Sequence, residues 1–204
     1  MNTERKEHWE KVYTTKQPHE VSWTQELPAT SLDFIHSFNA SKDAAIIDVG
    51  GGDSKLVDYL LDEGYQNITV LDISDSALDR AKQRLGSKAR NVKWIVSDIT
   101  DFAPAEKYDV WHDRATFHFL TTPQQVAAYM ATARSAVNNY MVIGTFSDKG
   151  PEKCSGLDIK QYTEDELQHE LEQGFQKIRC ITEDHTTPFN TTQNFLFCSF
   201  KKSA

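Results

Sequence analysis

Acidic side chains follow apolar, strand-like runs of the chain, and the first of them opens a glycine-rich loop. Asp48 lies near the end of one such run and is followed by Gly50, Gly51 and Gly52. Glycines at the carboxyl end of a strand allow the backbone to approach a ligand closely. Asp72 ends the next run, 20 positions after Gly52, and a carboxylate there can accept both hydroxyls of a ribose. The pattern predicts a site for a nucleoside-bearing cofactor.

The spacing and charge of this loop indicate which cofactor it binds. The dinucleotide fingerprint G-x-G-x-x-G fails at each of the three glycines, and Asp48 and Asp53 would repel a diphosphate. A cofactor with an ammonium and a sulfonium group fits better. A third acidic site, Asp98 followed by Ile99, can accept from the amino group of adenine and donate a backbone N–H to the ring. These residues favour S-adenosylmethionine over a nicotinamide cofactor.

Alternating strand-like and helix-like segments must position these residues. Apolar runs with strand character cover residues 44–49, 67–71, 92–96, 108–111 and 140–146. Helical periodicity covers residues 53–63, 74–85 and 123–137, and also two segments ahead of the first strand, residues 4–14 and 26–38. Residues 175–183 and 194–201 predict a C-terminal hairpin. The expected fold class is α/β: a doubly wound, mostly parallel sheet with helices on both faces and one antiparallel strand from the hairpin.

The composition narrows the expected partners and compartment. Thirty Asp and Glu residues against 22 Lys and Arg give a net charge of −8, which argues against nucleic acid or an anionic membrane as a partner. No apolar run approaches the length of a transmembrane helix, and the N-terminus has no apolar signal region. Cys154, Cys180 and Cys198 are widely spaced. This spacing predicts small buried residues in a reducing cytoplasm, without disulfides, a metal site or metalloid-binding thiols.

The motifs, in their order, resemble the class I (Rossmann-like) S-adenosylmethionine-dependent methyltransferases over residues 44–200. The resemblance rests on IIDVGGGDS, VLDIS, VSDI and YDVWHDRATFHFL, and further segments such as HWEKVY and GPEKCSGL are similar to small bacterial members of undefined substrate. It implies a seven-stranded sheet with one reversed strand, S-adenosylmethionine as cofactor and S-adenosylhomocysteine as product. It also implies a single domain over residues 1–204, with a helical lid (1–40), a cofactor-binding half (44–146) and a C-terminal helix and hairpin (147–204).

The resemblance also implies roles for individual residues. Around the methionine part of the cofactor it places Asp48, Gly50 and Gly52, with His112 and Asp113 near the amino group. Around the nucleoside it places Asp72 on the ribose, Ile73 against adenine, and Asp98 and Ile99 on adenine. It further implies that the N-terminal lid brings Tyr13 and Trp23 to the cofactor.

Fewer residues of the sequence indicate how the methyl acceptor would bind. Arg114 can bind a carboxylate, whereas His118, which can titrate near neutral pH, lies between Phe117 and Phe119. We expect Asp113, fixed by the sheet, to matter more to activity than His118. In-line attack on a sulfonium methyl depends on positioning and exclusion of water, so no metal is expected and no catalytic base is assigned.

The expected activity is methyl transfer to a small molecule or a protein side chain. A non-catalytic S-adenosylmethionine-binding module or sensor, and a nicotinamide-dependent oxidoreductase, are the alternatives.

Overall fold

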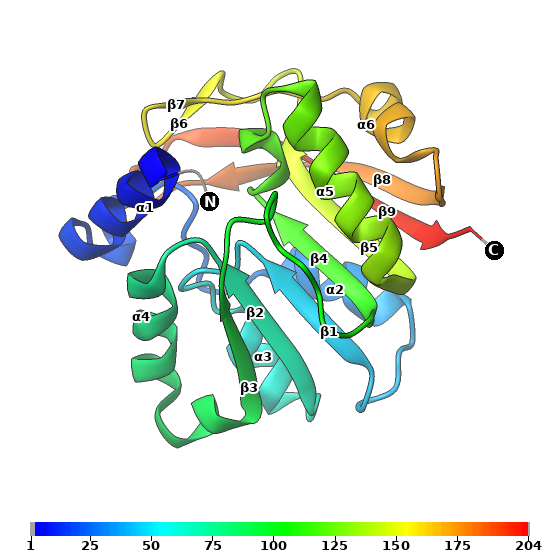
Figure 1. Cartoon of the computed structure of the whole chain (residues 1–204). Coiled ribbons are helices and arrows are strands. Elements are labelled where there is room, and N and C mark those ends of the chain that lie inside the picture. Colours follow the sequence, from blue (N-terminus) through cyan, green and yellow to red (C-terminus); the bar gives the residue numbers. More distant parts are fainter. Residues whose placement is uncertain (1–2, 204) are drawn as a thin grey trace.

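A computed structural model of the chain describes residues 3–203 and shows one twisted sheet with helices on both faces (Figure 1). The helices are α1 (Thr3–Thr15), α2 (Ala29–Ser37), α3 (Leu56–Asp62), α4 (Asp75–Leu85), α5 (Pro123–Ala136) and α6 (Glu164–Leu171). The strands of the sheet are β1 (Ala45–Val49), β2 (Asn67–Asp72), β3 (Val92–Val96), β4 (Tyr108–Arg114), β5 (Val137–Phe146), β8 (Phe175–Thr186) and β9 (Thr192–Lys202). A separate two-stranded ribbon pairs β6 (Lys153–Cys154) with β7 (Leu157–Asp158).

The strand order is β3-β2-β1-β4-β5-β9-β8. The first five strands pair in parallel, and β9 runs antiparallel to both of its neighbours, β5 and β8. The predicted seven-stranded sheet with one reversed strand from a C-terminal hairpin is therefore confirmed. Among the helices within residues 3–203, none has the length and apolar character needed to cross a bilayer.

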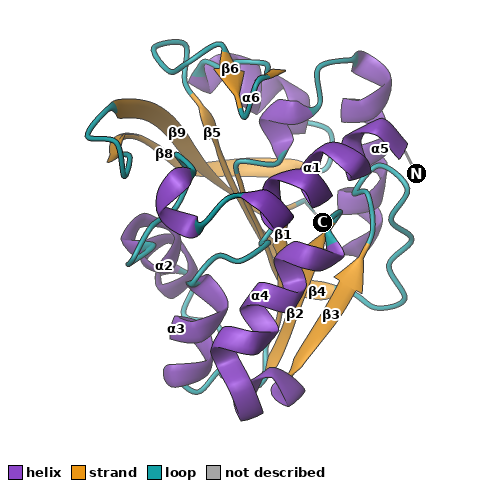
Figure 2. Cartoon of the chain, turned by 90° about the vertical axis from the view of Figure 1, so that its left-hand side faces the viewer, coloured by secondary structure: helices purple, strands orange, loops and turns teal. Residues whose placement is uncertain are grey.

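The core has one layer on each face of the sheet. Ile46 on β1 belongs to the layer that packs α2, α3 and α4, whereas Ile47, next to it, belongs to the layer that packs α5 and α6. Successive strand residues point to opposite faces, so a continuous apolar strand supplies both layers. Figure 2 shows these helices on either side of the sheet. A fully buried Ile or Leu contributes about 1.5–3 kcal/mol, which fixes the strand ends that carry the acidic residues.

The helix boundaries follow local capping chemistry. Ser74 is the N-cap of α4, as the sequence predicts, and its hydroxyl accepts a hydrogen bond from the backbone N–H of Ala77 at 3.1 Å. The helix expected over residues 53–63 is shorter, because α3 begins only at Leu56. Strand β5 begins at Val137 rather than at residue 140, and α5 ends one residue before it.

Cys180 and Cys198 form a disulfide between β8 and β9, so the expectation of no disulfide is wrong for this pair. The two residues face each other in the strand register, with their Cα atoms 4.1 Å apart. The sequence places both residues on paired strands, where they can be close, but only the register of the hairpin brings the two side chains together. Cys154 is a free, buried thiol, as predicted.

Candidate active site

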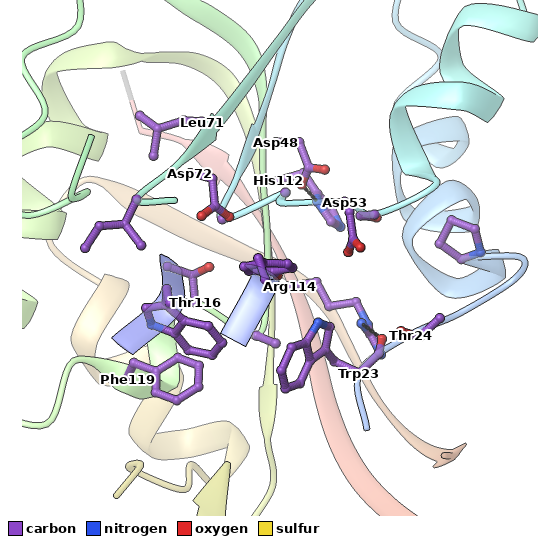
Figure 3. Close-up of a pocket in the computed structure, with 18 of the residues that line it drawn as sticks. Trp23, Thr24, Asp48, Asp53, Leu71, Asp72, His112, Arg114, Thr116 and Phe119 are labelled. Atoms are coloured by element: carbon purple, nitrogen blue, oxygen red, sulfur yellow. Dashed lines mark hydrogen bonds and ion pairs between the residues drawn. The ribbon is translucent and has the colours of Figure 1, made fainter. Parts of the chain in front are cut away.

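A cavity of about 300 Å³ lies at the carboxyl ends of the parallel strands (Figure 3). Eight of the ten predicted cofactor-binding residues line it, and they come from three strand ends and from the N-terminal segment: Tyr13, Trp23, Asp48, Gly50, Asp72, Ile73, Asp98 and Ile99. Gly52 and Asp113 do not line it. The open edge of a parallel sheet is where α/β folds bind ligands.

The loop after β1 has no room for side chains. Gly50 has φ +66°, and a Cβ there would lie 1.7 Å from the Oγ1 of Thr116. A Cβ on Gly51 would lie 2.6 Å from the Oδ2 of Asp48. Close packing therefore favours glycine at both positions, and at Gly50 the positive φ favours it as well; the bare loop exposes its backbone to the cavity.

A buried chain of hydrogen bonds holds Asp48. Asp48 and His112 are register partners on β1 and β4, and Nδ1 of His112 lies 2.7 Å from Oδ1 of Asp48. Nε2 of His112 lies 2.9 Å from the hydroxyl of Ser31 on α2. All three residues line the cavity and are almost fully buried. This contact fixes the Asp48 carboxylate, and Ser31 is a participant that the sequence pattern did not reveal because α2 carries no motif.

Asp72 is a buried carboxylate without a cationic partner among residues 3–203. Its Oδ1 accepts a hydrogen bond from the backbone N–H of Ser74 at 2.8 Å, and only 5% of the residue is exposed. Burial raises the pKa of this carboxyl to about 7. Asp53, which also lines the cavity, has its pKa raised by burial, although Arg80 lies 3.6 Å away.

Asp98 has one satisfied and one unsatisfied oxygen. Oδ1 accepts from the backbone N–H of Thr100 at 3.0 Å and from its hydroxyl at 2.8 Å, and Arg5 lies 3.5 Å from the same atom. Oδ2 is buried and has no hydrogen-bond partner within the described chain. A buried acceptor without a donor is unfavourable unless a ligand supplies one.

Aromatic residues of the N-terminal segment cover the cavity. Trp9 contacts Trp23 and Phe119 edge-to-face, with ring centroids 5.6 Å and 5.1 Å apart, and Tyr13 lines the same space. The carboxylate of Glu10 accepts from the backbone N–H of Asp75 at 2.6 Å, at the N-terminus of α4. A carboxylate is favourable at that end of a helix, so Glu10 ties α1 to α4.

The residues after β4 divide into two groups. Arg114 lines the cavity, whereas Asp113 and His118 do not. We expected Asp113 to pair with the cofactor or with Arg114, but its carboxylate instead accepts from the backbone N–H groups of Thr116 (3.0 Å) and Phe117 (3.1 Å) and from the Tyr129 hydroxyl (2.8 Å). Burial raises the pKa of Asp113 to about 6.

His118 is fully buried beneath this turn. Its Nδ1 accepts from the backbone N–H of Phe146 at 3.3 Å, and its ring stacks on the Phe146 ring with centroids 4.5 Å apart. Burial lowers the pKa of His118 to about 3. The imidazole is therefore neutral at physiological pH, and its surroundings are those of a packed core histidine.

Part of the chain matches known methyltransferases in sequence. Residues 46–139 match a family described as a methyltransferase domain. A malonyl-[acyl-carrier protein] O-methyltransferase from Anoxybacillus flavithermus is 33% identical over 106 residues, which make up 51% of this chain and 39% of that protein. The matched region thus covers well under half of this curated relative.

Solved structures share the fold over nearly the whole chain. One, from a study of the conversion of a disulfide bond into a thioacetal group during echinomycin biosynthesis, superposes with a TM-score of 0.78 at 16% identity, covering 97% of this chain and 93% of that one. Another is 1,6-didemethyltoxoflavin-N1-methyltransferase from Burkholderia thailandensis, solved with its substrate and S-adenosylhomocysteine, with a TM-score of 0.69 at 17% identity, covering 99% and 85%. Residues 46–139 are thus similar to a methyltransferase domain, and the whole chain shares its fold with these solved structures.

Proposed function

We propose that this protein binds S-adenosylmethionine and transfers its methyl group to an acceptor molecule. The observation that carries the proposal is the convergence of Asp48, Asp72 and Asp98, from the ends of three neighbouring strands, in one cavity. The Burkholderia enzyme, whose fold this chain shares, was solved with S-adenosylhomocysteine, and the matched relative is named as a methyltransferase. Both support the proposal.

The polar atoms of the cavity fit this cofactor. The unpartnered Oδ2 of Asp98 can accept from the amino group of adenine, and the Asp72 carboxylate can accept from the ribose hydroxyls. The bare backbone of the Gly50–Gly51 turn leaves space where side chains would clash. Asp48, held by His112, supplies negative charge for a cofactor that carries an ammonium and a sulfonium.

The residues that line the cavity support a mechanism based on positioning of the reactants. Bound S-adenosylmethionine supplies an electrophilic methyl carbon: the acceptor's lone pair forms the new bond while the C–S bond breaks and its electron pair stays on sulfur, giving S-adenosylhomocysteine. The acidic strand ends orient the methyl group, and the rings of Trp9, Trp23 and Phe119 exclude water from the reacting atoms. His112 has both ring nitrogens engaged, so we assign it to holding Asp48 in place.

A calorimetric titration with S-adenosylhomocysteine tests the binding step. Asp72→Ala removes the acceptor for the ribose hydroxyls, and each charged hydrogen bond lost costs about 1.5–3 kcal/mol, so we expect affinity to fall by about tenfold or more. Asp79→Ala, on the exposed face of α4, is the matched control and keeps wild-type affinity. Equal affinity of wild type and Asp72→Ala would remove the basis of the proposal.

Turnover tests the transfer step. We expect S-adenosylhomocysteine to form from S-adenosylmethionine when the small-molecule fraction of a cell extract is added, because the cavity is enclosed by the N-terminal segment. Activity with the protein fraction alone would indicate a protein side chain as the acceptor. Binding without turnover in either fraction would instead support a non-catalytic sensor.

A further inference from the structure

We propose that the methyl acceptor carries a carboxylate, and that Arg114, at the end of β4, binds it in the cavity. The inference rests on the proposed methyltransferase function and adds the class of acceptor. Figure 3 shows Asp48, Asp53 and Asp72 on one side of the pocket and Trp23, Arg114 and Phe119 on the other. Arg114 therefore lies on the side of the cavity that carries the aromatic rings.

Arg114 has unused hydrogen-bond donors. Its Nη1 donates to the backbone carbonyl of Trp23 at 3.0 Å, and its guanidinium lies over the Phe195 ring, 4.8 Å from the centroid. Nε and Nη2 are buried and have no acceptor within residues 3–203. These two nitrogens form one edge of the guanidinium, which is the edge that binds the two oxygens of a carboxylate side by side.

The other cationic residues that line the cavity already have acidic partners: Arg5 with Asp98, Lys55 with Glu26, and Arg84 with Asp58. For Arg114, no carboxylate lies within ion-pair distance in the part of the chain that the structure describes. A buried charge without a counter-charge is strongly unfavourable. An anionic ligand would remove that penalty.

Glu183 and Asp48 act electrostatically on Arg114, but neither forms an ion pair with it within the described residues. Cys154 lines the same part of the cavity, and burial raises the pKa of its thiol to about 12, so the thiol is neutral. Glu183 is the strongest electrostatic neighbour of Arg114, yet it makes no ion pair with Arg114, and its Oε2 is buried without a hydrogen-bond partner among the described residues. Trp23, Phe119 and Ala115 form the remaining wall. The acceptor that fits is a small acid with an apolar or aromatic body.

Pairs of a small acid and its neutral amide, such as phenylacetate with phenylacetamide and hexanoate with hexanamide, test the inference. Binding is measured by calorimetry with the protein saturated by S-adenosylhomocysteine. We expect at least one acid to bind about tenfold more tightly than its amide. Arg114→Met, which keeps the length of the side chain, should abolish this preference, and Arg114→Lys should reduce it because an ammonium lacks the two-nitrogen edge. Arg90→Met, at an exposed arginine, and Glu183→Gln should retain it.

The controls separate this inference from the proposed function. If wild-type protein does not bind S-adenosylhomocysteine, the proposed function itself fails. If it binds the cofactor product but prefers none of the acids, or if Arg114→Met keeps the preference, the acceptor assignment is overturned. A loss of cofactor affinity in Arg114→Met as large as the loss of acid affinity would also overturn it. Should Arg114→Met not fold, Arg114→Lys decides: an unchanged preference for acids would contradict the two-nitrogen contact.

Discussion

Asp113 lies at the end of β4 and His118 five residues further on, and their contacts predict unequal effects on activity. Asp113 caps the backbone N–H groups of Thr116 and Phe117, and Thr116 packs against Gly50 in the cavity. We expect Asp113→Asn to lower kcat/KM about tenfold, because a charged hydrogen bond contributes about 1.5–3 kcal/mol. His118→Asn should lower stability with a smaller change in kcat/KM.

The measurement uses both variants well below their melting temperatures, once an acceptor is known. Affinity for S-adenosylhomocysteine is determined in parallel, so that a loss of cofactor binding is not mistaken for a loss of catalysis. The opposite ranking, with His118→Asn the more impaired and cofactor affinity intact, would make His118 the candidate base.

Asp72 makes the stability of the ligand-free protein depend on pH. Its folded-state pKa of about 7 lies above the ordinary value, so between about pH 4 and pH 7 the folded state holds a proton that the unfolded state has released. Stability therefore falls as pH rises through this window. We expect the free energy of unfolding to be about 1 kcal/mol larger at pH 6 than at pH 8. The Tm should accordingly be about 2–4 °C higher at pH 6.

Thermal unfolding of wild type and Asp72→Asn between pH 5.5 and 8 checks this expectation. The neutral amide cannot titrate, so the slope of Tm against pH should be smaller in the variant. Asp113, with its pKa of about 6, contributes with the same sign and accounts for a residual slope. An identical slope in the two proteins would show that Asp72 does not carry the effect.

At the scale of elements, α1 is attached to the domain by few polar contacts. Glu10 binds the N-terminus of α4, and Arg5 reaches Asp98, the residue that we assign to adenine. Cofactor binding should therefore order this segment, as lids are ordered by their ligands. We expect amide exchange across residues 9–23 to slow by about tenfold when S-adenosylhomocysteine is added.

Hydrogen exchange followed by mass spectrometry measures this change, and α5, on the opposite side of the sheet from α2–α4, is the internal control. Equal protection of residues 9–23 with and without the ligand would mean that α1 is a fixed part of the domain rather than a lid.

The β8–β9 hairpin is cross-linked by Cys180 and Cys198. Closing a loop of this length by a disulfide contributes about 3 kcal/mol, so a reductant should lower the Tm by about 6–12 °C. The denatured oxidised protein should show one reactive thiol, that of Cys154, and the reduced protein three. Three thiols before reduction would show that the pair is not bonded, and Cys180→Ser should then leave the Tm nearly unchanged.

At the scale of the whole molecule, the sequence predicted the features that depend on residues close together in the chain. The apolar runs predicted the parallel strands of the sheet. Asp48, Asp72 and Asp98 lie at or just after the ends of three of these strands, so the topology of the sheet brings them together. The role of Ser31 depends on a contact between segments far apart in the chain, for which no local pattern exists. The disulfide depends on the exact register of a hairpin whose two strands the sequence does predict. Asp113 was placed on the correct strand end, but its side-chain direction depends on Tyr129, a partner on α5.

The position of α1 in the chain also affects how the protein acquires its site. Its contact with Asp98 spans 93 residues, so during synthesis α1 leaves the ribosome long before its partners exist. A helix of 13 residues is marginally stable in water by itself, and contacts between distant segments form late in folding. We therefore expect α1, with Trp9 and Tyr13, to dock on the domain only after the sheet has formed, so that closing of the cavity would be the last step of folding.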